Sequence, residues 1–547
     1  MTDTLKKAEV AHLKDRLDEM RQDRAPHEAM WSQIAEFIFP RRDFYLSPEG
    51  PNARRRRSLT DTTAQTAHQR LSALLHGYMI NPYQPWFNPA LSDRPADRDE
   101  ALWFEDVRDR MFRFYSGSRS SFRTASHETL QDDTAFGNSV LWMGRRRFAA
   151  PPFYKAIPLK EAFFAENDEG QVDTLYREWH PTLAQAHRAF PDCGWIKDKF
   201  KDEKEENSQK LHLIHAVEPR ADGAPGASAT RKPFSSAVYD LSEDKTVKVS
   251  GFDGFPYAVT RFNRRAGETY GVGVGWDSLP MVKLLNAMMD TILRQAELAA
   301  DPPLVDMSGR LETLDRSAGA VNSIDVSDMG MMQPEQILRR VHEGGDVQPG
   351  VELLRDIRAQ VESMWFTDWM TLRENSAMTA TEINERRDLR LRSMSPIVAR
   401  GEQEKLTVTV DRTFQLMQES NMFLQPPQSL DGAQIEWEYT SPLAMAQRLG
   451  EIEASMRSLD LAATASQLDP EALHVLDLPE IVRDGATAAG SPTRHTRSRE
   501  DVAERIEAMQ KAIERKAEIA DAAAAAGGIR DLGQGAQSLN AAGAEAA

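Results

Sequence analysis

The chain is poor in the residue types that several classes of protein require. Its 547 residues include a single cysteine, Cys193, which excludes a disulfide framework and a multi-cysteine zinc site. No apolar run approaches the roughly 20 residues that a membrane-spanning helix needs. The residues from Met1 to Lys7 lack the apolar core of a signal peptide. These absences predict an intracellular, soluble protein that has no membrane partner.

Positive charge is also in deficit. The chain carries 67 lysine and arginine residues against 84 aspartate and glutamate residues, which gives a net charge of −17. Proteins that wrap nucleic acid tightly are usually basic, so this balance argues against wrapping, although it allows a protein past which DNA slides. Hydrophobic residues make up 41% of the chain, which is typical of a globular protein with a sizeable core. At roughly 150 residues per domain, the length suggests three or four domains.

Motifs that would commit the chain to catalysis are missing. Gly271-Val-Gly-Val-Gly275 has the wrong spacing for a dinucleotide fingerprint, and no phosphate loop of the type G-x-x-x-x-G-K-[ST] occurs. We interpret this glycine-rich stretch as a flexible joint into the helix after Pro280. His127-Glu128 lacks the second histidine of a zinc protease, and Asp132-Asp133 is a pair expected by chance among 84 carboxylates. We therefore expect no enzyme activity, no cofactor and no metal site.

What the chain does contain is mostly helical periodicity, interrupted by one β-rich part. In the first quarter, apolar residues recur at helical intervals before Pro26, at 27–39, after an N-cap at Asp61 or Thr62, at 99–115 and at 122–136. Residues 138–265 contain β-rich runs at 140–148, 172–179, 211–218, 237–241 and 257–262. Asn167-Asp-Glu-Gly170 is a turn signal typical of a hairpin. The predicted fold class is α+β and mainly helical.

The second half of the chain returns to helices. They are expected at 280–300, at 351–372, from the capping box Thr379-Ala-Thr-Glu382 to 419, and along a near-heptad pattern at 499–526. Asp301-Pro-Pro303 ends the first of these sharply, and Pro396 would bend the third. A short strand is expected at 434–439, and the Ala- and Gly-rich tail at 527–547 is predicted to be disordered.

Two basic clusters are candidate contacts for phosphate or for an acidic partner. They are Arg54, Arg55, Arg56 and Arg57, and Arg145, Arg146 and Arg147. Arginines in such runs are equally compatible with simple solvation, so the pattern leaves these alternatives open.

Six short segments occur one after another in a recognisable order over about residues 20–500. They are Arg24–Trp31 with Phe39-Pro-Arg-Arg42; Asp61-Thr-Thr with Leu71–Gly77 and Pro85-Trp-Phe87; Gly170–Arg177 with Pro181-Thr182; Gly275–Pro280 with Asp301-Pro-Pro303; Met378–Glu382 with Arg386 and Pro396; and Tyr439–Ala444 with Gln447-Arg448. Together they resemble the portal, or head-to-tail connector, proteins of short-tailed bacteriophages. The tail after Ala526 has no counterpart in that family.

The resemblance implies a portal-type subunit of a ring of about twelve copies around a central channel. It assigns residues 1–270 to the wing, 271–300 and 351–372 to a two-helix stem, 301–350 to the clip, 379–440 to a long helix and a wing strand, and 441–526 to a helical crown. It also implies a DNA-facing channel loop formed by Arg373, Glu374, Asn375, Ser376, Ala377 and Met378.

The same resemblance implies a function at one vertex of a viral capsid. The ring would pass double-stranded DNA during packaging and ejection and retain the genome between them. Its partners would be the major capsid protein, scaffold, terminase motor and tail adaptors, first in the host cytoplasm and then in the virion. Two alternatives stay open: an ATP-driven nucleic-acid enzyme of the packaging machinery, which the missing phosphate loop disfavours, and a non-channel scaffold protein, which would not explain the β-rich middle.

Overall fold

The computed structural model describes residues 5–40, 59–117, 120–146, 149–200, 208–300, 304–306, 338–340, 348–367, 394–439, 442–465, 476–488, 495–497 and 500–519. Helices predominate and the strands form several sheets, which confirms the predicted α+β, mainly helical fold. The chain divides into two compact units. The first comprises residues 1–87, 109–423 and 439–443, and the second comprises residues 88–108, 424–438 and 444–547.

The first helix, α1 (Lys7–Phe37), runs unbroken through Pro26, so the prediction of two separate helices is wrong. A proline inside a helix removes a backbone hydrogen bond and costs about 3 kcal/mol. Burial on both sides of the proline outweighs that cost, since Leu17, Trp31 and Ile34 are at most 2% exposed. Arg24 Nη1 also donates hydrogen bonds of 2.8 and 3.0 Å to backbone carbonyls next to the sheet.

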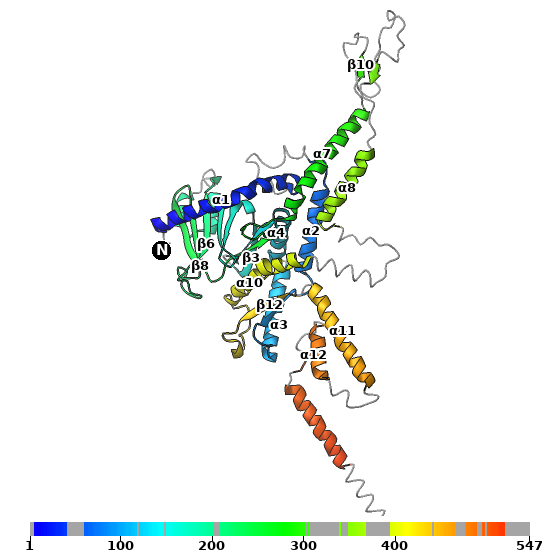
Figure 1. Ribbon diagram of the computed structural model, residues 1–547. Helices are drawn as coiled ribbons and strands as arrows, with labels where there is room; N and C mark the ends of the chain where they lie inside the picture. Colours follow the sequence, from blue (N-terminus) through cyan, green and yellow to red (C-terminus); the bar gives the residue numbers. More distant parts are fainter. Residues whose placement is uncertain are drawn as a thin grey trace, which may run out of the picture. The chain divides into compact units, whose positions relative to one another are not determined.

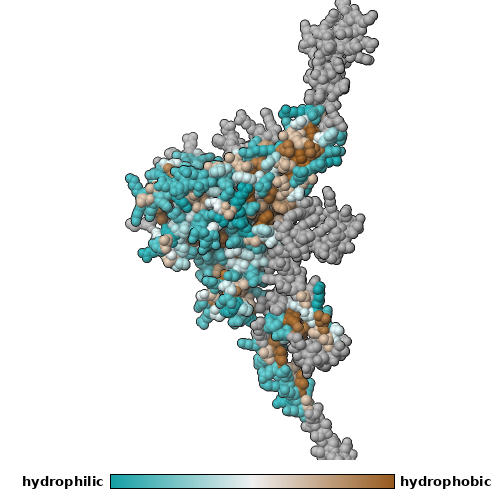
Figure 2. All heavy atoms as spheres, in the orientation of Figure 1, coloured by the Kyte–Doolittle hydropathy of each residue, from teal (hydrophilic) through white to brown (hydrophobic). Residues whose placement is uncertain are grey.

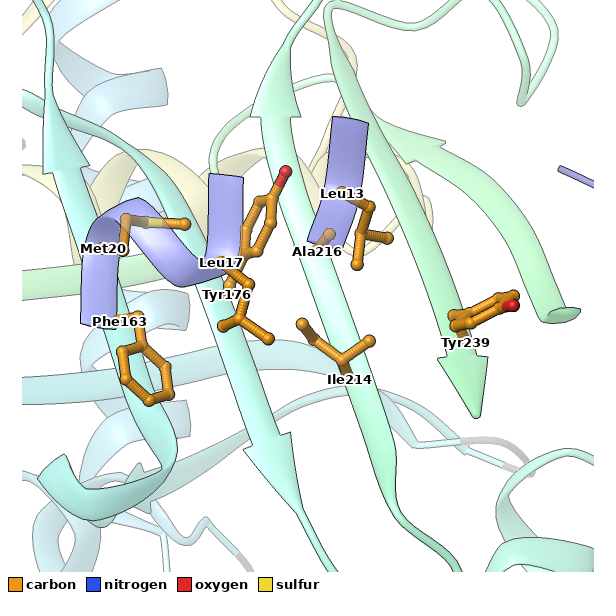
Figure 3. Close-up of a cluster of buried hydrophobic side chains, with 8 residues drawn as sticks. All are labelled: Leu13, Leu17, Met20, Phe163, Tyr176, Ile214, Ala216 and Tyr239. Carbon is orange, nitrogen blue, oxygen red and sulfur yellow. The ribbon is translucent and has the colours of Figure 1, made fainter. Parts of the chain in front are cut away.

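Helix α1 covers one face of a five-stranded antiparallel sheet (Figure 1). The strands are β4 (Ala162–Glu166), β5 (Val172–Trp179), β6 (Leu213–Pro219), β7 (Phe234–Asp240) and β8 (Lys245–Phe252), in that order. Figure 3 shows Leu13, Leu17 and Met20 of α1 lying over side chains of these strands, Ile214 among them. Successive side chains of a strand point to opposite faces. Leu213 therefore packs on the other face, in the cluster formed with α5 (Leu183–Ala189) and α6 (Gly194–Lys199).

The β4–β5 hairpin turns where the sequence predicts it. Asn167 and Gln171 are joined by a backbone hydrogen bond of 2.8 Å, and Gly170 has a φ of +77°. Strand β5 has the predicted bounds. Strands β4 and β8, together with β3, were not predicted from the β-rich runs.

A second, three-stranded sheet in the order β3-β2-β9 lies against helix α4 (Phe122–Phe136), which in turn packs against helix α2 (Thr63–Met79). Its strands are β2 (Asn138–Arg146), β3 (Ala149–Ile157) and β9 (Tyr257–Arg261). Thr62 is the N-cap residue of α2, while the Asp61 carboxylate accepts a 2.8 Å hydrogen bond from the Thr63 amide, which satisfies one free donor of the first turn. Helix α4 has the predicted bounds.

The glycine-rich stretch 271–275 is a tightly packed junction, so its interpretation as a flexible joint is wrong. All five residues are buried. Asn138, at the start of β2, accepts a 2.7 Å hydrogen bond from the Gly271 amide and returns one of 2.9 Å to its carbonyl. A Cβ on Gly273 would lie 2.6 Å from the backbone nitrogen of Gly137, which itself has a φ of +85°. Glycine is needed here because two backbone segments approach too closely for a side chain.

Two helices follow in the first unit, α7 (Val274–Ala300) and α8 (Gln348–Met364), and they pack side by side (Figure 1). Helix α7 begins ahead of Pro280, earlier than predicted, and α8 ends at Met364 rather than at 372. Between them in the chain, β10 (Leu304–Asp306) and β11 (Leu338–Arg340) form an antiparallel pair.

A further helix of the first unit runs from 394 and includes the predicted helical stretch 406–410. It contains a π-helical segment (Glu402–Thr407) and then continues as α10 (Val408–Gln418). In a π-helix each backbone amide bonds to the carbonyl five residues earlier, which inserts an extra residue into the helical turn.

The second unit contains the remaining elements. Helix α3 (Arg98–Ser116) begins in it, β1 (Phe87–Leu91) pairs with β12 (Ile435–Tyr439), and α11 (Pro442–Ala465), α12 (Leu478–Ala488) and a helix at 500–519 follow. The predicted strand at 434–439 is thus confirmed, and residues 500–519 of the predicted final helix are helical. Within this unit Arg98 and Asp501 form an ion pair of 2.9 Å. The predicted tail at 527–547 lies outside the described residues.

Candidate functional site

The residues predicted to meet DNA or a partner fall largely outside the described part of the chain. Arg54–Arg57, Arg147 and the loop Arg373–Met378 all lie there. Arg145 lies near the end of β2, 43% exposed, and forms an ion pair with Glu419 after α10. Its charge is therefore already matched by a carboxylate of the same chain. Arg146 is the last residue of β2.

The α7–α8 pair is fixed to the start of α2 by a buried carboxylate and an amide. Asn286 Oδ1 of α7 accepts hydrogen bonds from the backbone amides of Thr60 and Asp61, at 3.0 and 3.1 Å. Arg358 Nη2 of α8 lies 2.8 Å from Asp61 Oδ2. Burial raises the pKa of Asp61, but hydrogen bonds from Thr63 and the Arg358 ion pair outweigh it, so the pKa lies below its ordinary value. One acid thus holds both helices in place.

Trp365 fixes the end of α8 to the start of α7. The side chain is fully buried, and its indole Nε1 donates a 3.1 Å hydrogen bond to Ser278 Oγ. Its ring centroid lies 5.5 Å from that of His68 in α2. Helices α7 and α8 are therefore tied to α2 and its start by both polar and aromatic contacts.

Large apolar side chains remain exposed on the α7–α8 pair. Leu284 and Leu293 of α7 are 45% and 43% exposed, and Leu353 of α8 is 50% exposed. Figure 2 shows the hydrophobic patch over these helices. Exposed apolar patches are typical of surfaces that bind another protein.

The helix at 500–519 of the second unit carries a similar exposed stripe. Ile506, Met509 and Ile513 are spaced three and four residues apart and are 46%, 67% and 58% exposed. That spacing places them on one helical face, which is typical of a helix that packs against another helix.

A buried ionic cluster, which no sequence motif marks, surrounds Arg261 at the end of β9. Arg261 is 2% exposed, its Nη1 lies 2.7 Å from Glu166 and its Nη2 2.8 Å from Glu404 in the π-helical segment. Nη2 also donates to the Gly170 carbonyl at 2.8 Å, and Arg264 lies 2.6 Å from Glu166. Arg400 Nη1 also lies 3.4 Å from Glu404. Three guanidinium groups and two carboxylates therefore join the β4–β5 hairpin, β9 and the helix from 394.

A second buried cluster involves the acid pair Asp132-Asp133 of α4. Each acid is 2% exposed, and Lys405 of the π-helical segment is 1% exposed. Lys405 Nζ lies 3.5 Å from the Ser126 carbonyl oxygen. Burial raises the pKa of Asp133 and lowers that of Lys405, and their mutual attraction opposes both shifts. The pair Asp132-Asp133, which is expected by chance in the sequence, thus belongs to an internal polar cluster.

His215 in β6 makes stability depend on pH. Its Nδ1 lies 2.8 Å from Tyr257 Oη and its Nε2 2.9 Å from Ser236 Oγ. Burial, reinforced by the charges of Arg177 and Lys248, lowers the pKa of His215 to about 3. Below about pH 6.5 the unfolded chain binds a proton that the folded chain excludes, so stability present above pH 6.5 is lost as the pH falls.

We expect His215 alone to lower the free energy of unfolding by about 2 kcal/mol between pH 6.5 and pH 5. The His215→Gln variant keeps hydrogen-bonding groups but cannot take up a proton. Its melting temperature should therefore fall less than that of the wild type over this range, as measured by scanning fluorimetry. Equal falls in the two proteins would contradict the prediction.

Other kinds of site find no support in the part of the chain that the structure describes. Those residues contain no group of three or more His, Cys, Asp or Glu side chains placed to bind a metal ion. Within the same residues, none of the helices has the length and apolar character to cross a membrane. Cys193 is buried, and burial raises the pKa of its thiol, as befits a structural residue.

Comparison with known proteins gives three matches. Residues 10–496 match the family described as bacteriophage head to tail connecting protein. The chain is 26% identical over 480 residues to the probable portal protein of Bordetella phage BPP-1, covering 85% of this chain and 84% of that protein. It is 25% identical over 517 residues to the portal protein of Salmonella phage epsilon15, covering 89% of this chain and 88% of that protein.

Proposed function

Because the chain belongs to the family of bacteriophage head-to-tail connecting proteins, we propose that it forms a ring of about twelve subunits around a DNA channel at one capsid vertex. The ring would pass double-stranded DNA during packaging and ejection and retain it between them. It would dock the terminase motor and later the tail adaptors, and contact the major capsid protein and scaffold. The role is structural and mechanical rather than enzymatic. The family match over residues 10–496 is the observation that carries the proposal.

The arrangement around α7 and α8 supports the assignment of a two-helix stem and a clip. The two helices pack together, and the short antiparallel pair β10–β11 lies between them in the chain. A stem of this kind must be held rigidly if it is to line or support a channel, and the Asp61–Arg358 ion pair supplies that support. We assign the wing to residues 1–270, the clip to 301–350, the channel loop to 373–378 and the crown to 441–526.

Ring formation gives a use to the exposed leucines of the stem. In a closed ring every subunit presents two different faces to its neighbours, and each face needs a complementary partner surface. Leu284, Leu293 and Leu353 would be covered by the stem of the adjacent subunit. Because these leucines are already about half-buried, covering the rest of each contributes about 0.7–1.5 kcal/mol, half of the value for a fully exposed leucine.

We expect electron microscopy of the purified protein to show closed rings of about twelve subunits with a central hole. Leu353→Glu should reduce the fraction of rings at least tenfold, because a charge buried at each interface is repeated around the ring. Ala359→Glu, at an exposed position about 120° around the same helix from Leu353, adds the same charge and should leave ring formation unchanged. If the protein stayed monomeric or dimeric at high concentration and with scaffold present, the proposal of a ring would be wrong.

DNA passage requires weak rather than tight contact with phosphates. Each contact of a Lys or Arg side chain with a phosphate adds affinity and therefore slows the movement of DNA. A subunit charge of −17 would weaken this attraction if acidic residues face the channel.

We expect deletion of residues 375–378 to leave ring assembly intact but to reduce packaging or retention of the genome. Normal infectious yield from this deletion would contradict a channel loop. DNA-stimulated ATP hydrolysis by the purified protein would instead favour the enzyme alternative.

A further inference from the structure

The π-helical segment 402–407 interrupts an otherwise regular helix between 394 and Gln418. Thr407 Oγ1 donates a 3.0 Å hydrogen bond to the carbonyl of Glu402, five residues earlier, and accepts a 2.9 Å hydrogen bond from Tyr439 Oη. π-Helical turns are rare, and they occur frequently at functional positions. A six-residue segment therefore needs a physical reason.

Side-chain contacts to two different elements hold the segment in this register. The Glu404 carboxylate accepts hydrogen bonds from the Arg261 backbone amide at 2.8 Å and from its Nη2 at 2.8 Å, which fixes one side of the helix to β9. The next residue, Lys405, extends instead to the Ser126 carbonyl in α4. Neighbouring residues are thus engaged by different elements, and both contacts depend on where the extra residue lies.

The same register leaves local polar groups unsatisfied. Among the described residues, three buried hydroxyl oxygens around the segment have no hydrogen-bond partner: Ser126 Oγ, Thr260 Oγ1 and Thr409 Oγ1. A buried polar atom without a partner costs about 1–3 kcal/mol. These costs offset part of what Glu404 and Lys405 contribute to the π-helical register.

The two ends of the helix differ in how firmly they are held. On the C-terminal side, Thr413 Oγ1 lies 2.7 Å from Tyr154 Oη in β3, and Val410 is fully buried. On the N-terminal side, Met394 and Val398 are each 7% exposed and Gly401 is buried against the flexible end of Met79, so this part is held by apolar packing that side-chain rotation can adjust. A shift in register would therefore move 394–401 and leave α10 in place.

We propose that residues 402–407 form a register switch, which exchanges between the π-helical form and an α-helical form in which 394–401 moves by one residue relative to α10. One residue of an α-helix corresponds to 1.5 Å along the axis and about 100° of rotation. Glu404 and Lys405 hold the π-helical form, and releasing them allows the other. The switch goes beyond the connector role and rests on the fold of the first unit alone.

Hydrogen exchange of the full-length protein, followed by mass spectrometry, tests the switch. Amides of 402–407 should exchange at least about tenfold faster than those of 408–418, because each conversion breaks their hydrogen bonds. Deleting Glu402 removes the extra residue and should abolish this difference. Glu402→Ala removes the same side chain but keeps the residue count, so fast exchange should persist.

Two results would overturn the proposal. The first is equal exchange of 402–407 and 408–418 in the wild type, a comparison that needs no variant and holds even if the deletion fails to fold. The second is an unchanged difference in a folded Glu402 deletion. Neither measurement involves DNA or ring formation, so the two proposals are tested independently. A negative exchange result would not contradict the connector role, and an absence of rings would not contradict the switch.

Discussion

Replacing Arg261 with methionine should lower the free energy of unfolding by about 3–5 kcal/mol. The substitution keeps much of the side-chain volume but removes the guanidinium that lies 2.7 Å from Glu166 and 2.8 Å from Glu404. Removing one partner of a buried ion pair is costly. Arg264 still faces Glu166 and Arg400 still lies 3.4 Å from Glu404, but both are more exposed than Arg261 and compensate the two acids only in part. Urea unfolding of the purified variant, compared with the wild type, measures the loss.

The Arg264→Met variant provides the matched control for this prediction. Arg264 also pairs with Glu166, at 2.6 Å, but its side chain is 23% exposed and Arg261 remains to balance the acid. We expect it to cost about 1 kcal/mol or less. If the two variants lost similar free energies of unfolding, the number of charges in the cluster would decide its contribution to stability, and the buried position of Arg261 would not.

Gly273→Ala should strongly destabilise the first unit. A Cβ at this position would lie 2.6 Å from the Gly137 nitrogen, 2.8 Å from the Thr134 carbonyl oxygen and 2.9 Å from the Asp133 carbonyl oxygen. All three are backbone atoms, so no side-chain rotation relieves the overlap. We expect a loss of about 3 kcal/mol or more, visible as a lower melting temperature or as loss of soluble protein.

Gly77→Ala adds the same methyl group where it meets no atom within 4 Å. Gly77 lies on the exposed side of α2, and alanine has the higher helix propensity, so this control should raise stability by up to about 1 kcal/mol. If Gly273→Ala were as stable as the wild type, the junction between α4, β2 and the glycine-rich stretch would have to be looser than described.

Local sequence patterns predicted those elements whose stability is itself local. The bounds of α4 and β5 follow from periodicity and turn residues that lie within or beside each element. The prediction failed where distant contacts override a local penalty, as in α1, which continues through Pro26. Strand β3 was missed because it contains Pro151 and Pro152, and prolines argue against a strand. It is an edge strand, where a missing backbone hydrogen-bond donor is tolerated.

The buried clusters could not be predicted from the sequence for a related reason. Arg261 lies 95 residues from Glu166 and 143 residues from Glu404, and nothing in the local sequence of any of the three marks it as a partner. The glycines at 271–275 are conspicuous in the sequence, but such a run is typical both of a flexible joint and of a place where two backbone segments approach closely. Only the position of Gly137 against them distinguishes the two.

The order in which the strands occur along the chain sets the order in which the two sheets can form during synthesis. Strands β4 to β8 pair only with their sequence neighbours, so this meander can assemble as each hairpin leaves the ribosome. Strand β2 pairs with β9, with Asn138 opposite Arg261, so its sheet stays incomplete until the whole meander has been made. At about 5–20 residues per second, the β2–β3 hairpin waits several seconds with one edge unpaired. A nascent chain therefore leaves this edge of β2 unpaired for longer than the edge of any inner strand of the meander.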